Sequence, residues 1–210
     1  YAVFNQAGSP APRCAFAKVT VNGKNLGIYS HVESVRKPLL ARGFGNDAGT
    51  LYEGTVVDFY EDWEGSLEHK RGDDKPGREK IRQLIQLLES EEASEEAIGR
   101  LVDLDSFYRF WAIEGLLGFW DGYSGNRNNF FVYLNPETDK FHFLPWGADS
   151  MFEKYSPLGV DRRSPRSVRT VGLVAHKLYQ IPAVRKKYAT SMKKLMAHHW
   201  DDAKPVSYTH

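Results

Sequence analysis

The chain has 210 residues, of which 41% are hydrophobic, 13% aromatic and 26% charged, and its formal net charge is +1. This balance predicts a folded chain with a substantial core, arranged as one large domain or as two lobes that share a cleft. Basic residues are not collected in blocks, which argues against nucleic-acid or membrane-surface binding, and no apolar run reaches the roughly 20 residues that cross a bilayer.

The ends of the sequence and its single cysteine allow three further expectations. The chain starts on "YAVFNQAGSP", which lacks both the methionine and the basic and apolar regions of a signal peptide, so we expect a domain excised from a longer protein. The only cysteine, Cys14, excludes an intrachain disulfide and a cysteine zinc site. We expect this thiol to be buried and structural.

The first 75 residues are predicted to form a β-rich lobe. Apolar and polar residues alternate in "CAFAKVTVNGKNLGIYSHV", and the central Asn22-Gly23 favours the tight turn of a hairpin. A short helix is expected from about Glu33 to Arg42, and "TLYEGTVVDFY" is typical of a strand. The charged segment from Glu61 to Gly77 has no apolar periodicity, so we expect a mobile connector there.

Residues 76–210 are predicted to form a mainly helical lobe with one inserted hairpin. Helical periodicity is clear in "GREKIRQLIQLLES", and a shorter helix is expected from Ser94 to Val102. "DLDSFYRFWAIEGLLGFW" predicts a largely buried helix that Asp103 or Asp105 caps and that ends at Asp121-Gly122. "NNFFVYLNPETDKFHFLPW" predicts the hairpin, and one or two helices close the chain. The expected class is α+β, with a cleft between the two lobes.

The stretch "DGYSGNRNNFFVYLNPETDKFHFLPWGAD" is rich in oxygen ligands and runs from Asp121 to Asp149. Asp121 and Asn126 have the D-x-x-x-x-N spacing of a protein-kinase catalytic loop, where the aspartate takes the hydroxyl proton and the asparagine binds Mg²⁺. Mg²⁺ prefers hard oxygen ligands at about 2.1 Å. Because a hairpin brings its two ends together, Asp149 is predicted to share this site. The alternative is that Asp121 and Asn126 only cap helix ends and turns.

Three blocks of the sequence also resemble one protein family. They are "VNGKNLGIYSHVESVRKPLLARGFGNDAGTLYEG", "FWDGYSGNRNNFFVYL" and "FHFLPWGAD", and together they span roughly residues 17–149. They resemble the spore coat protein H (CotH) kinase-like family of atypical secreted or surface protein kinases. The resemblance implies a kinase-like two-lobed fold, ATP with Mg²⁺ or Mn²⁺, and transfer of the γ-phosphate to serine or threonine hydroxyls of secreted or surface proteins. It also implies a secreted, periplasmic or cell-surface location.

The resemblance assigns roles residue by residue in the second and third blocks. It implies that Asp121 is the catalytic aspartate, that Asn126 is a metal ligand, and that Asn129 assists or replaces Asn126. Asp149 matches the metal-binding aspartate that follows the "PW" strand. The family commonly has a second acidic residue where this chain has Gly147. Asp149 is therefore expected to hold the metal as the only carboxylate.

The phosphate-binding residues are harder to assign, because the chain has neither a G-x-G-x-x-G loop nor a V-A-I-K strand. Phosphates need cations, so Arg36 and Lys37 are the candidates, with Glu33 orienting them through an ion pair. The alternative is that these three residues form a solvated helix face. Glu53 stands where the family often has a basic residue, which predicts weaker phosphate binding.

Two other functions compete with a protein kinase. Gly147 and Glu53 favour a catalytically weak pseudokinase, a nucleotide-binding structural module of a surface assembly. A metal-dependent phosphoesterase would use the same oxygen ligands to activate water, but nothing in the sequence supplies the further carboxylates or histidines that such sites usually use. The expected partners are a nucleotide and a protein substrate, without nucleic acid and without membrane insertion.

Overall fold

The computed structural model describes residues 1–152 and 168–200, and these residues form two antiparallel sheets with several helices. One sheet has two strands, β1 (Cys14–Val21) and β2 (Lys24–Val32). The other has the order β4-β3-β5-β6, and its strands are β3 (Thr50–Gly54), β4 (Glu68–Arg71), β5 (Phe130–Asn135) and β6 (Lys140–Pro145). The chain is therefore a mixed α and β protein, as the α+β prediction requires.

The helices occur before, between and after these strands. Those before β5 are α1 (Ala2–Gln6), α2 (Lys37–Phe44), the 3-10 helix η1 (Glu61–Ser66), α3 (Asp74–Glu89), α4 (Glu95–Leu101), α5 (Leu104–Leu116) and α6 (Tyr123–Asn126). After β6 the described residues form α7 (Leu173–Gln180) and α8 (Pro182–His198).

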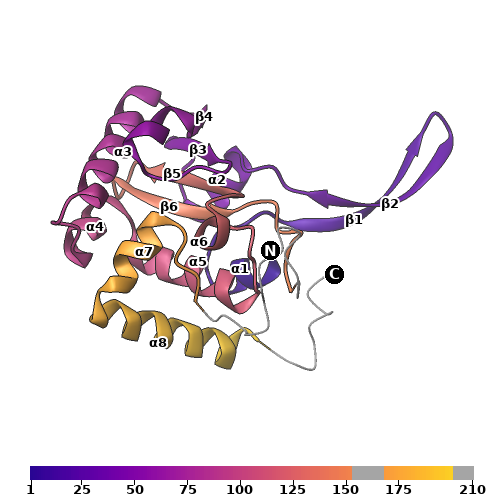
Figure 1. Cartoon of the computed structure of the whole chain (residues 1–210). Coiled ribbons are helices and arrows are strands. Elements are labelled where there is room, and N and C mark those ends of the chain that lie inside the picture. The colour runs from indigo at the N-terminus through magenta and orange to yellow at the C-terminus, as the bar shows by residue number, and fades with distance from the viewer. Residues whose placement is uncertain (153–167, 201–210) are drawn as a thin grey trace.

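Three strands of the four-stranded sheet, β3, β5 and β6, are buried on both faces, whereas the edge strand β4 is largely exposed. Alternate residues of β5 point to opposite sides, so Phe131 and Tyr133 pack with Leu39 and Leu40 of α2. The other face of the sheet contributes Phe130 and further apolar residues to the larger core cluster that includes α3, α4 and α5. Figure 1 shows α3 and α4 beside the sheet, and α5 beneath it. The sheet is thus the middle layer between α2 and the other helices.

The sheet joins strands that are far apart in the sequence. β3 pairs with β4 on one side and with β5 on the other, and Leu51 lies opposite Tyr133 in the second pairing. Residues 1–75 and residues 76–210 therefore both contribute strands to this sheet. The division of the chain into two lobes at this boundary stays a prediction.

The β1–β2 hairpin and α2 were predicted well. Asn22 and Gly23 form the turn with positive φ angles of 50° and 78°, as the Asn-Gly signal predicts. The helix expected from about Glu33 starts later, at Lys37, because Pro38 suits only the first turn of a helix. Cys14, which we expected to be buried, is exposed on β1. That prediction was wrong because both faces of the hairpin are largely exposed.

The prediction of a mobile connector between Glu61 and Gly77 was also wrong. This segment contains η1, β4 and the start of α3. The guanidinium of Arg78, one turn into α3, donates to the carbonyl oxygens of Glu64 and Leu67 at 2.7 and 3.0 Å. A short charged strand at a sheet edge has no apolar period, so its pairing with β3 left no signal in the sequence.

The long apolar helix ends five residues before the predicted Asp121. α5 closes at Leu116, and Gly118 then adopts a φ of 60°, which turns the chain towards α6. At its start, Asp103 is the capping residue, since its carboxylate accepts from the amide of Ser106 at 2.9 Å. The structure thus decides between the two candidate caps.

We predict that Asp103→Ala lowers the free energy of unfolding by about 1 kcal/mol, because the first turn of α5 loses its capping acceptor. Urea unfolding at neutral pH measures the change. The matched control is Asp105→Ala, which removes an exposed first-turn carboxylate that does not cap the helix. Equal losses from the two substitutions would contradict the assignment of the cap.

Candidate functional site

Asp121 lies at the centre of a hydrogen-bonded loop that covers residues 121–129. One oxygen of its carboxylate accepts from the side-chain amides of Asn126 and Asn128, at 2.7 and 3.1 Å. The other oxygen accepts from the amide of Asn129 at 2.8 Å. The structure therefore brings the side chains of Asp121, Asn126 and Asn129 together. The catalytic role predicted for Asp121 and the metal-binding role predicted for the two asparagines stay predictions.

The direction of these hydrogen bonds separates the three asparagines. Each donates its NH₂ group to Asp121, so the amide oxygen of each is directed away from that carboxylate. The oxygen of Asn128 is already used, since it accepts from the backbone amide of Val56 at 3.1 Å. The oxygens of Asn126 and Asn129 accept no hydrogen bond within the described part of the chain.

A buried carboxylate on α5 holds the start of this loop. Glu114 is fully buried, and its two oxygens accept from the backbone amides of Tyr123 and Ser124 at 2.9 and 2.8 Å. These amides form the first turn of α6, where backbone N–H groups have no partner within the helix. Gly122 permits this approach, because a Cβ at that position would lie 2.3 Å from the Glu114 carboxylate.

A second buried carboxylate, Asp58, ties the loop to α7. It accepts from the Tyr123 hydroxyl at 3.0 Å and from the backbone amide of Leu173 at 2.7 Å. The Tyr123 oxygen accepts in turn from the amide of Val174 at 3.0 Å. Burial raises the pKa of Asp58 to about 6 and that of Glu114 to about 7.

The chain after β6 lies beside Asn129. The backbone amide of Trp146 donates to the Asn129 carbonyl at 2.9 Å, and a Cβ on Gly147 would lie 2.5 Å from the side-chain oxygen of Asn129. Asp149 follows in a tight turn and is exposed. Its side chain makes no direct hydrogen bond to Asp121, Asn126 or Asn129 among residues 1–152 and 168–200, so its part in the site stays a prediction.

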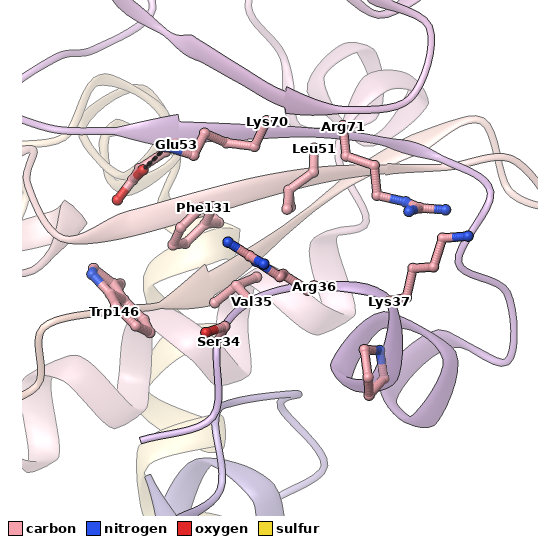
Figure 2. A pocket seen from close by; sticks show the side chains of 11 residues that line it. Ser34, Val35, Arg36, Lys37, Leu51, Glu53, Lys70, Arg71, Phe131 and Trp146 are labelled. Carbon is pink, nitrogen blue, oxygen red and sulfur yellow. Dashed lines mark ion pairs between the residues drawn. The ribbon is translucent and has the colours of Figure 1, made fainter. Parts of the chain in front are cut away.

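A cavity of about 590 Å³ opens between the start of α2 and the sheet. Figure 2 shows Glu53 and Trp146 at one end of it and Lys37 and Arg71 at the other, with Arg36 extending between them. The lining residues are Ser34, Val35, Arg36, Lys37, Pro38, Leu51, Glu53, Lys70, Arg71, Phe131 and Trp146. Because Trp146 is hydrogen-bonded to Asn129, the cavity and the 121–129 loop are neighbours at this end of the sheet.

The four cations of the cavity differ in their pairing. Lys70 is 2.7 Å from the carboxylate of Glu53 and 3.0 Å from that of Glu68, and Arg71 pairs with Asp47 at 3.5 Å. Arg36 and Lys37 have no ion-pair partner in the part of the chain that the structure describes, and both are exposed. They are therefore the cations most available to an anion in this cavity.

Glu33, the third residue predicted here, has a different position and partner. It is not part of the cavity lining, and its carboxylate is 2.7 Å from the guanidinium of Arg42. It also accepts from the backbone amide of Arg13 at 2.9 Å. Glu33 thus joins the base of the β1–β2 hairpin to α2. It forms its ion pair with Arg42, whereas the prediction was an ion pair that orients Arg36 or Lys37.

Sequence reasoning missed several residues of the site. Lys70 and Arg71 lay in the segment predicted to be a connector, so they could not be placed next to the cavity. Glu114 left a usable signal, since it is a lone carboxylate within the apolar run "FWAIEGLLGFW". A charge at a core position of a buried helix requires polar partners, and here the partners are the amides of α6.

Comparison with known proteins now decides the family. A family model described as CotH kinase protein matches residues 1–202. The chain belongs to the CotH family. The family model covers the 121–129 loop, the cavity and all the strands.

Three curated proteins are similar to the chain. Inner spore coat protein H of Bacillus subtilis is 29% identical over 161 residues, which cover 70% of this chain and 43% of that protein. Spore coat protein homolog 1 of Rhizopus delemar is 29% identical over 115 residues, or 52% of this chain and 19% of that protein. Invasin CotH2 of the same fungus is 23% identical over 171 residues, or 71% and 28%. The chain spans less than half the length of each of these relatives.

Two features are absent from the described residues, 1–152 and 168–200. These residues contain no helix with the length and apolar character that a membrane span needs. They also contain no cluster of three or more His, Cys, Asp or Glu side chains that could hold a metal ion.

We predict that Glu114 makes stability depend on pH. Its pKa rises from 4.5 to about 7 on burial, so between these values the folded chain binds more protons than the unfolded chain. The free energy of unfolding, relative to that of Glu114→Gln, should fall by on the order of 3 kcal/mol as pH rises through this window and stay constant above it. Denaturant unfolding at several pH values measures both proteins, with Glu96→Gln as the exposed control. Parallel profiles for wild type and Glu114→Gln would contradict the prediction.

We also predict that Gly147→Ala destabilises the chain by about 1 kcal/mol or more, because the residue has a φ of 49° and no space for a Cβ beside Asn129. Thermal or urea unfolding measures the loss. Gly65→Ala is the control, since a Cβ there meets no atom within 4 Å. If Gly147→Ala is no more damaging than Gly65→Ala, the close packing of the Gly147 turn on Asn129 is disproved.

Proposed function

We propose that this CotH-family chain is an atypical metal-dependent protein kinase, which transfers the γ-phosphate of ATP to serine or threonine hydroxyls of secreted or surface proteins. One observation carries the proposal. A carboxylate, Asp121, is fixed by three asparagine amides at the end of a sheet, and the neighbouring cavity contains cations that have no ion-pair partner among residues 1–152 and 168–200. The kinase-like, two-lobed arrangement implied by the resemblance is part of this proposal.

Asp121 is the proposed catalytic residue. A carboxylate has about four lone-pair positions, and the Asn126 and Asn128 amides occupy the two on one oxygen. The second oxygen accepts from the Asn129 side chain, which leaves it one position for a further hydrogen bond. An acceptor hydroxyl would donate to this position, so Asp121 would orient the hydroxyl and take its proton during transfer.

The donor set of the loop fits Mg²⁺ or Mn²⁺. Asn126 and Asn129 each present a neutral amide oxygen, and Asp149 is exposed close to the Gly147 turn on Asn129. These three residues would hold the metal, since hard oxygens are the ligands that such cations prefer. When bound, the metal would neutralise charge on the transferred phosphate.

The cavity is the proposed site of the nucleotide. Its volume of about 590 Å³ is in the usual range for small-molecule sites. Arg36 and Lys37 would neutralise phosphate oxygens, because they have no carboxylate partner among the described residues. Phe131 and Trp146 supply an apolar surface of the kind that a nucleobase packs against.

A second candidate function is a pseudokinase, a nucleotide-binding structural module of a surface assembly. The observation in its favour is the ion pair between Glu53 and Lys70, 2.7 Å apart inside the cavity. The Glu53 carboxylate neutralises Lys70, one of the four cations of the cavity, and repels phosphate. Both effects would weaken the binding of a triphosphate. The names of two relatives, inner spore coat protein H and spore coat protein homolog 1, also support a secreted or surface location for either function.

We predict that Asp121→Asn lowers the rate of phosphate transfer by about 10² to 10⁴-fold, because the hydroxyl loses its proton acceptor. Incorporation of labelled phosphate from ATP, with Mg²⁺ or Mn²⁺, measures the rate. Asp62→Asn, a substitution at an exposed residue of η1, is the control for the loss of one negative charge. Wild-type incorporation by Asp121→Asn or by Asp149→Ala would overturn the kinase.

A thermal-shift measurement separates the two candidate functions. A chain that binds nucleotide must be stabilised by ATP with the metal, because the ligand binds the folded state. Stabilisation together with transfer supports the kinase, whereas stabilisation without transfer supports the pseudokinase. The substitutions Arg36→Ala and Lys37→Ala should reduce the stabilisation in either case.

A further inference from the structure

The β1–β2 hairpin projects from the rest of the molecule as an arm, as Figure 1 shows. Both faces of the arm are largely exposed to solvent. Four large apolar side chains on it are at least half exposed: Phe16 at 62%, Val21 at 50%, Ile28 at 74% and Tyr29 at 51%. A two-stranded ribbon is only marginally stable alone, and exposed apolar patches mark interaction sites, so the arm is suited to a partner.

The register of the hairpin divides these side chains between the two faces. Phe16 lies opposite Ser30, and the next pair on the same face is Lys18 opposite Ile28. The pair between them, Ala17 and Tyr29, points to the other face. Each face thus offers a large apolar side chain, and the outer edges of β1 and β2 offer backbone groups that pair with no strand among the described residues. An extended segment could bind such an edge by strand addition.

The charge of the arm indicates the kind of segment. Between Cys14 and Val32 the sequence contains Lys18 and Lys24 but no aspartate or glutamate. An acidic segment would therefore be attracted to the arm. Two arms packed together would bring their lysines close to one another, and lysines on edge strands oppose such self-pairing. The charge favours an acidic partner over a second copy of the chain.

The base of the arm leads directly into the cavity. β2 ends at Val32, and Ser34 is already part of the cavity lining. The base is held in place, because the carboxylate of Glu33 binds both the Arg42 guanidinium and the backbone amide of Arg13. A segment that lies along β2 is therefore led into the cavity at Ser34, which Figure 2 shows near Trp146.

We propose that the β1–β2 hairpin docks the protein acceptor: an extended, acidic segment of the substrate adds to the edge of β2, with its apolar side chains on Phe16, Ile28 or Tyr29. This inference rests on the proposed function, because it takes the cavity as the nucleotide site and the neighbouring Asp121 as the residue that orients the acceptor hydroxyl. It also gives Glu33 a role as the residue that fixes the arm relative to α2.

Binding of a labelled peptide tests the arm without ATP. The probes are a fluorescent 15-residue acidic peptide with one serine and a counterpart in which lysines replace the acidic residues. Fluorescence anisotropy should show that the wild-type chain binds the acidic peptide more tightly than the basic one. The double variant Phe16→Ser/Ile28→Ser should weaken binding of the acidic peptide about tenfold, as loss of central apolar contacts does. Met196→Ser, at an exposed apolar residue of α8, is the control.

Charge reversal provides the second variant. Lys18→Glu/Lys24→Glu should exchange the preference, so that the basic peptide binds more tightly. The docking role is overturned if the wild-type chain does not prefer the acidic peptide, or if the hairpin variants bind it with wild-type affinity. It is equally overturned if sedimentation shows a wild-type dimer that Phe16→Ser/Ile28→Ser makes monomeric, because the arm then binds a second copy.

The readouts also separate this inference from the proposed kinase. Peptide binding is measured without nucleotide, whereas the kinase fails if labelled phosphate is not transferred. If the chain binds the acidic peptide through the arm but transfers no phosphate, the docking role is supported and the proposed kinase activity is contradicted. If the chain transfers phosphate equally well with and without the hairpin substitutions, the kinase activity is supported and the docking role of the arm is contradicted.

Discussion

The contact between the buried Glu114 carboxylate and the first turn of α6 is the constraint on which the candidate site depends. Two backbone amides that a helix start leaves unpaired meet two oxygens that α5 carries into the core. Neither group could be buried alone without a large desolvation cost. Together they fix where the chain leaves α5 and where Asp121 stands. The order of the loop therefore comes from the core beneath it.

The sheet places the two halves of the site side by side. β5 begins one residue after Asn129, and β6 ends one residue before Trp146, so the pairing of these strands sets the distance between the loop and the cavity. The cavity itself lies on the α2 face of the same sheet. The 121–129 loop, which holds the Asp121 carboxylate, and the cavity thus both lie against the same sheet. A reaction that needs a fixed carboxylate near an anion-binding cavity would have both in place.

Local patterns in the sequence were enough for most elements and for the loop, because their signals lie within a few residues. The Asn22-Gly23 turn and the spacing of Asp121 and Asn126 are of this kind, and the three-dimensional contacts agree with them. Only some of the residues that line the cavity could be predicted from the sequence. Arg36 and Lys37 were named, but Lys70 and Arg71 enter through an edge strand whose pairing is a tertiary event. The partner of Glu33 was missed because α2 starts only at Lys37, so that Glu33 lies before the helix and pairs with Arg42 in its last turn.

The position of β3 between β4 and β5 has a consequence for how the chain reaches its native state. The backbone amide of Gly49 donates to the hydroxyl of Tyr133, a residue 84 positions later. During synthesis, the edge of β3 that pairs with β5 stays unpaired until α3, α4 and α5 have been made and β5 has followed them. Such distant pairings slow folding and leave a strand edge open to misassembly in the meantime. The nascent protein is thus most vulnerable to aggregation before β5 emerges.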